Sequence, residues 1–106
     1  MKVTNYNKLV RDKVPQIIKD SGKECVCETL PDEEYIKMLN EKLVEEAREY
    51  TETGDIEELA DMGEVMHAIL DYKNTSLEEF QKVRMEKLQA HGGFKDRILL
   101  KEVIEK

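Results

Sequence analysis

Apolar residues recur with a helical period over most of the chain, and polar breaks divide the pattern into segments. After Pro31, apolar positions three or four residues apart predict a long amphipathic helix that ends at Thr53-Gly54. Asp32 is its expected N-cap, followed by two acids that favour the positive end of the helix dipole. The apolar stripe consists of Ile36, Leu39, Leu43, Ala47 and Tyr50.

Two further helices follow in the same pattern. The first spans residues 56 to 72 behind the N-cap candidate Asp55, and the next begins after Ser76, which forms a capping box with Glu79. This last helix is expected to stop at residues 91 to 93, where two glycines end the pattern. The apolar positions are Leu59, Met62, Val65, Met66, Ile69 and Leu70 in the first and Leu77, Phe80, Val83 and Leu88 in the second.

The two ends of the chain carry weaker patterns. Pro15 suits a first helical turn and predicts a short helix over residues 16 to 20. Residues 24 to 30 fit either a short strand or an extended connector, and residues 94 to 106 hold enough apolar side chains for a docking segment. The expected fold class is therefore all-α: a helical bundle with antiparallel central helices and a short extended segment near the N-terminus.

Composition and charge narrow this picture. With 106 residues, of which 39% are charged and 6% aromatic, residues 1 to 106 form one domain with a thin core, which favours self-association as a homodimer or homotetramer. The net charge of −7 argues against nucleic-acid binding. No stretch approaches the roughly 18 apolar residues of a membrane span, and none resembles a signal peptide, so a cytoplasmic protein is expected. Cys25 and Cys27 are expected to stay reduced, since a disulfide across one residue is strained.

Two acidic pairs near the middle of the chain are the main candidates for chemistry. Glu46 and Glu49 lie on the first long helix and Glu58 and Asp61 on the second, each pair at i,i+3 spacing on one helix face. If the two helices pack side by side, the four carboxylates converge. Such an oxygen-rich site suits a hard divalent cation, Mg²⁺ first and Mn²⁺ as the second candidate.

The position of these acids relative to the apolar stripes supports a function. Glu46 falls on the stripe of its helix, and Glu58 and Asp61 border the apolar face of theirs. An ionised carboxylate near an apolar interface is costly unless it is paired or bound to metal. The alternative is ordinary surface charge: the chain has 24 acids, and Lys42 or Arg48 are placed to form helix-face ion pairs with Glu45 or Glu49.

The acid motifs resemble those of a known superfamily. Glu45-Glu46-x-x-Glu49 followed by Glu58-x-x-Asp61 is similar to the signature of the all-α nucleoside triphosphate pyrophosphohydrolases, which include the MazG-like proteins and phosphoribosyl-ATP pyrophosphohydrolase. The string from Tyr6 to Pro15 and Gly92-Gly93-Phe94 resemble a small MazG-like subgroup, so the resemblance covers residues 6 to about 97. Eight residues separate Glu49 from Glu58, a spacing closer to the phosphoribosyl-ATP enzyme, and the downstream acid and asparagine motif of the dimeric dUTPases has no match.

The resemblance implies Mg²⁺-dependent hydrolysis of a nucleoside triphosphate, or a related nucleotide, to the monophosphate and pyrophosphate. Non-standard nucleotides are one substrate class for such an enzyme. Carried onto this sequence, the metal ligands are Glu46, Glu49, Glu58 and Asp61, and Glu45 or Glu49 orients or deprotonates the attacking water. Basic side chains are then needed for the phosphates. The candidates are Lys8, Arg11 and Lys13, then Lys95 and Arg97, then Arg84 and Lys87.

A second function class stays open on the sequence alone. A helical dimerisation or binding module without catalysis would use the acids only as surface charge. Glu46→Ala would then leave both stability and metal affinity nearly unchanged.

Overall fold

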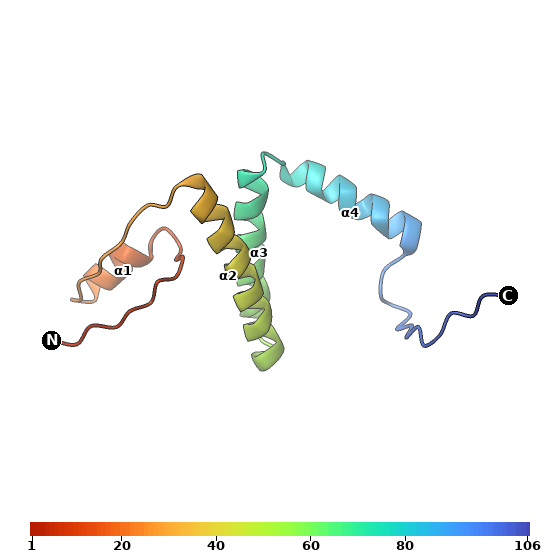
Figure 1. The fold of residues 1–106 in the computed structure, drawn as a ribbon, viewed down its shortest axis with the longest axis horizontal. Coiled ribbons are helices and arrows are strands. Elements are labelled where there is room, and N and C mark those ends of the chain that lie inside the picture. The colour runs from red at the N-terminus through yellow and green to blue at the C-terminus, as the bar shows by residue number, and fades with distance from the viewer. The chain divides into compact units, whose positions relative to one another are not determined.

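A computed structural model describes all of residues 1 to 106 and is all-helical, as predicted (Figure 1). Its elements are α1 (Val14–Asp20), α2 (Asp32–Thr53), α3 (Ile56–Tyr72) and α4 (Leu77–His91). Residues 24 to 30 form no strand, so of the two expectations for this segment the connector is correct. The chain divides into two compact units, Met1–Asn74 and Thr75–Lys106, and each is described by itself.

Local sequence sets the ends of the helices in the first unit. Pro15 lies in the first turn of α1, which begins two residues earlier than predicted. The N-cap of α2 is Pro31 rather than Asp32, which is the first helical residue. Its carboxylate still lies in the first turn, where it favours the helix dipole. Gly54 ends α2 in the left-handed conformation, with φ of 72° and its N–H donating to the carbonyl of Tyr50 at 2.7 Å.

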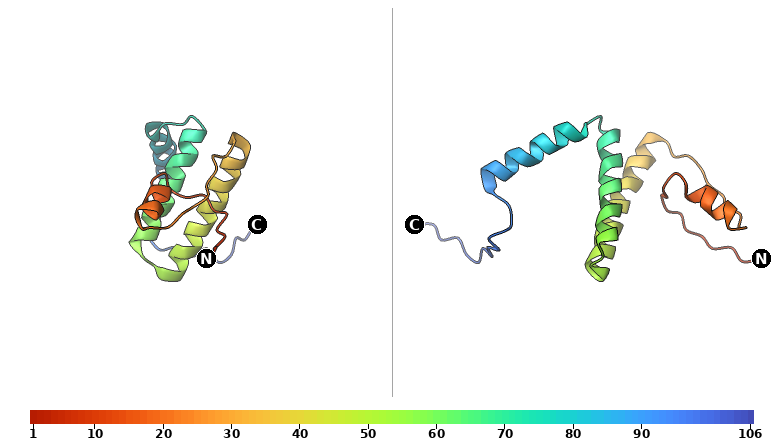
Figure 2. Two further views of the ribbon diagram at one scale, coloured as in Figure 1. Left: turned by 90° about the vertical axis from the view of Figure 1, so that its left-hand side faces the viewer. Right: turned by 180° about the vertical axis from the view of Figure 1, so that it is seen from behind.

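α2 and α3 lie side by side and form the core of the first unit (Figure 2). Leu39 and Val65 are the only buried hydrophobic residues. The rings of Tyr35 and Tyr72 meet edge to face, with centroids 6.1 Å apart. The core is as thin as the composition predicts, and Leu59 and Met66 on α3 remain partly exposed.

The second unit contains α4 and the C-terminal residues. Ser76 caps α4 as predicted, its hydroxyl accepting a hydrogen bond from the Glu79 N–H at 3.1 Å. α4 buries none of its residues, and residues 94 to 106 form no helix. None of the four helices is long and apolar enough to cross a membrane.

Candidate metal centre

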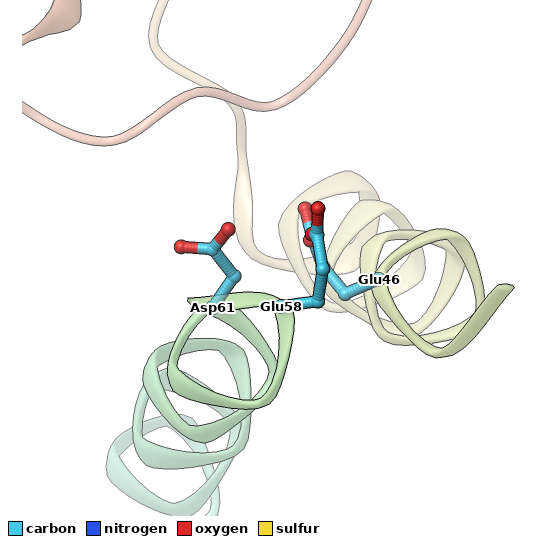
Figure 3. A group of neighbouring side chains, drawn as sticks. All are labelled: Glu46, Glu58 and Asp61. Atoms are coloured by element: carbon cyan, nitrogen blue, oxygen red, sulfur yellow. The ribbon is translucent and has the colours of Figure 1, made fainter. Parts of the chain in front are cut away.

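Three carboxylates from α2 and α3 converge at one point (Figure 3). Glu46 of α2 and Glu58 and Asp61 of α3 each place one oxygen within 4.8 Å of the others. The i,i+3 spacing puts Glu58 and Asp61 on the same face of α3, and the packing of the two helices brings Glu46 to them. The structure thus brings together three of the four predicted metal ligands.

Glu46 is the most constrained member of this group. Its residue is only 6% exposed, and its Oε2 atom is buried without a hydrogen-bond partner. Its Oε1 atom lies 3.5 Å from Nζ of Lys42. Burial raises the pKa of the Glu46 carboxyl, and the charge of Glu49 adds to this. A buried carboxylate oxygen without a partner is costly, and a divalent cation bound by oxygen ligands would supply the missing partner.

Glu49, the fourth predicted ligand, lies beside the three rather than among them. Its carboxylate raises the pKa of both Glu46 and Glu58. The pKa of Glu58 is raised by desolvation first and then by a hydrogen bond shared with Glu49. Mutual repulsion among these acids therefore disfavours full ionisation without a counter-ion.

Two basic residues of the N-terminal segment reach the acids. Nζ of Lys8 lies 2.9 Å from Oε1 of Glu45, and Nη2 of Arg11 lies 2.7 Å from Oδ1 of Asp61. Lys8 thus pairs with an acid of α2 and Arg11 with an acid of α3. Both were predicted as phosphate ligands, and the structure places them at the edge of the acidic centre.

Lys42 is a third cation of this centre, and it is not among the residues that the sequence selects for the site. Its Nζ atom lies 3.6 Å from Oε2 of Glu45 and 3.5 Å from Oε1 of Glu46. Its spacing had predicted an ion pair with Glu45 as ordinary surface charge, and the structure confirms that pair and adds the one with Glu46.

Glu45 uses both carboxylate oxygens in ion pairs, one with Lys8 and one with Lys42. The hydrogen bond from Lys8 and the charge of Lys42 lower the pKa of the Glu45 carboxyl, although its partial burial acts in the opposite direction. A carboxylate with a lowered pKa is a weaker base. The geometry therefore suits Glu45 to holding the two lysines more than to accepting a proton.

Five further residues were predicted as phosphate ligands. Lys13 is the N-cap of α1 and forms no ion pair with the acids. Arg84, Lys87, Lys95 and Arg97 belong to the second unit, where Arg84 bonds the side chain of Gln81 at 3.2 Å. These five roles stay predictions.

Comparison with known proteins adds one partial similarity. A protein of Mycolicibacterium smegmatis, described as uncharacterized, is 49% identical over 41 residues, which are 39% of this chain. The matched region spans 42% of that protein's length. No family model matches the chain. No solved structure matches it either.

Proposed function

We propose that the chain is a Mg²⁺-dependent nucleotide pyrophosphohydrolase of the all-α, MazG-like kind, acting in the cytoplasm. The observation that carries the proposal is the convergence of Glu46, Glu58 and Asp61, together with a buried oxygen of Glu46 that has no partner. The resemblance of the acid motifs to this superfamily supplies the reaction class. Non-standard nucleoside triphosphates are the proposed substrate class.

The acids have distinct roles in this proposal. Glu46, Glu58 and Asp61 hold the cation, which when bound neutralises phosphate oxygens and lowers the pKa of a water. Glu49 lies next to two of these ligands and is either the fourth ligand or the group that takes the proton of the attacking water. We assign Glu45 to positioning, because its two oxygens hold Lys8 and Lys42.

The cations around the centre supply the phosphate contacts. Lys8, Arg11 and Lys42 all lie within 4.0 Å of acids of the cluster or its neighbour Glu45. A triphosphate that enters with its own metal carries more negative charge than a single carboxylate. Its oxygens would therefore be more highly charged partners for these three side chains. They would then bind substrate and stabilise the charge that the reaction transfers to pyrophosphate.

A second copy of the chain completes the bundle in this proposal. The pair formed by α2 and α3 buries only two hydrophobic residues and leaves Leu59 40% and Met66 37% exposed. Pairing with the same helices of another copy, as a homodimer or homotetramer, would cover this apolar surface.

The test is pyrophosphate release from canonical and modified nucleoside triphosphates and from phosphoribosyl-ATP, with Mg²⁺ or with a chelator. Release should require Mg²⁺ and should fall by at least about a hundredfold in Glu46→Gln. Glu57→Gln is the matched control, because Glu57 is an exposed acid directly before Glu58 on α3. If no substrate releases pyrophosphate and Glu46→Gln keeps the metal affinity of the wild type, the proposal fails and a helical dimerisation module explains the chain better.

A further inference from the structure

A hollow of about 260 Å³ lies beside the acidic centre, between the N-terminal segment and α2. Tyr6, Asn7 and Leu9 line it from the N-terminal side, and Met38, Lys42 and Glu45 from α2. Its volume is just below the roughly 300–1,000 Å³ of typical small-molecule sites. The hollow therefore has room for a flat ring system but not for a whole nucleoside triphosphate.

The hollow and the acidic centre share their boundary. Lys8, Lys42 and Glu45 line the hollow, and Lys42 also lies 3.5 Å from Glu46 of the metal cluster. Met38, Lys42 and Glu45 follow one another at i, i+4 and i+7 on one face of α2, so Met38 and Glu45 lie about 10 Å apart along the helix axis. A nucleotide with its phosphates at the centre would extend its other end along this face toward Met38.

The lining suits a nucleobase. Tyr6 is 73% exposed and makes no ring contact, whereas Tyr35 and Tyr72 pair with each other. Aromatic side chains beside phosphate-binding groups are the usual platforms on which bases stack. Met38 offers an adaptable thioether to the same space.

Asn7 adds a neutral polar group to a lining that also holds the charged side chains of Lys8, Glu41, Lys42 and Glu45. Its side-chain amide can both donate and accept hydrogen bonds, as recognition of a base edge requires. Its backbone has φ of 47°, in the left-handed region that asparagine tolerates, and in the sequence it stands between Tyr6 and Lys8. Neighbouring residues thus present a stacking surface, a base-edge partner and a phosphate partner in sequence.

We infer that this hollow is the nucleoside subsite, in which the base stacks on Tyr6 and the phosphates pass Lys8 and Lys42 to the acidic centre. The inference rests on the proposed function and adds the place where the base of its substrate binds. The ligand is a nucleoside triphosphate, and a phosphoanhydride without a base would forgo these contacts.

The experiment compares two ligands that share the phosphates and differ in the base. Binding of an α,β-methylene nucleoside triphosphate and of inorganic tripolyphosphate is measured by calorimetry with Mg²⁺. Tyr6→Ala should weaken the nucleotide roughly tenfold, the loss of one stacked base, and leave tripolyphosphate unchanged. Tyr6→Phe should retain nucleotide affinity, and Val3→Ala, an exposed apolar change in the same segment, should alter neither.

Two results would overturn the inference. One is an equal loss for both ligands in Tyr6→Ala, which would mean that Tyr6 only holds the N-terminal segment in place. The other is a wild-type affinity for tripolyphosphate that matches its affinity for the nucleotide.

Failure of the proposed function gives a different result, in which neither polyphosphate binds in a Mg²⁺-dependent way. In that case free nucleosides are titrated at millimolar concentration while the methyl resonance of Met38 is followed. A shift that disappears in Tyr6→Ala would still support the subsite, and an unmoved resonance would overturn it.

Discussion

Nη2 of Arg11 lies 2.7 Å from Oδ1 of Asp61, so one predicted metal ligand is paired with a cation of the chain itself. A divalent ion that binds Asp61 must compete with this guanidinium. The pair is about half exposed on both sides, and ion pairs of this kind contribute at most about 1 kcal/mol. Arg11 is therefore a weak internal competitor that a metal can displace.

Arg11→Gln should tighten Mn²⁺ binding in the absence of nucleotide, by up to about fivefold, because the competitor is gone. The same variant should bind triphosphate more weakly, because a phosphate partner is lost. Calorimetric titration with each ligand measures both effects. For the Mn²⁺ titration the control is Lys13→Gln, which removes a charge of the same sign from the same segment without an ion pair to the acids. Equal shifts of the Mn²⁺ affinity in the two variants would contradict the competition.

Glu46→Gln should stabilise the metal-free protein by about 1 kcal/mol, because it removes a buried charge whose Oε2 atom has no partner. Mg²⁺ should raise the midpoint of urea unfolding in the wild type and leave it unmoved in the variant. A variant that is less stable than the wild type in chelator would show that the pair with Lys42 outweighs the unpartnered oxygen.

The stability of the metal-free protein should fall as the pH rises from about 5 to about 7.5. Burial and neighbouring acids raise the pKa values of Glu46 and Glu58 above the ordinary value of 4.5, so folding favours their protonated forms. Their contribution is complete below the unfolded value and is lost as the pH rises through the folded ones. Glu45 has the opposite sign: its pKa is lowered, and its contribution is lost only in more acidic solution.

Urea midpoints at the two pH values, with and without Mg²⁺, check this expectation. Mg²⁺ binds the ionised carboxylates and should remove the loss at the higher pH. Glu46→Gln should have a shallower pH dependence than the wild type. Parallel curves for the two proteins would contradict a raised pKa at Glu46.

Gly54→Ala should destabilise the first unit by about 1–2 kcal/mol, because the residue has φ of 72° and a side chain there is strained even though the space is open. Gly63→Ala is the matched control within α3, where no atom lies within 4 Å of the added carbon. It should stabilise by about 0.5–1 kcal/mol, since alanine is the better helix former. Chemical denaturation measures the free energy of unfolding of both variants. Equal changes in the two would contradict the role of the backbone at Gly54.

The helices could be predicted because local chemistry determines their ends. Gly54 and the hydroxyl of Ser76 mark boundaries that the structure confirms. The prediction of Asp32 as the N-cap of α2 was wrong by one position. Pro31 adopts the extended conformation that an N-cap requires, and the helix begins at Asp32 itself. The spacing on each helix likewise predicted which acids share a face.

The rest of the site could not be predicted from local patterns. Lys8 and Arg11 are separated from their acids by 37 and 50 residues, and no periodicity links such distant positions. The two ion pairs of Glu45, on which its positioning role in the proposed function rests, depend in part on this long-range contact. The thin core was visible in the composition, but the orphaned oxygen of Glu46 needed the packing of α3 against α2.

Because Lys8 and Arg11 are far in sequence from the acids that they pair with, the connector between α1 and α2 affects how these pairs form. Two ion pairs this exposed could not hold a free peptide, because a gain of about 1 kcal/mol each corresponds to dissociation above millimolar concentration. Together with α1, residues 21 to 31 tether Lys8 and Arg11 to α2 and give them an effective concentration on the order of millimolar at the acids. The length and stiffness of this short connector, and not only the charges it joins, therefore set how often the basic segment occupies the site.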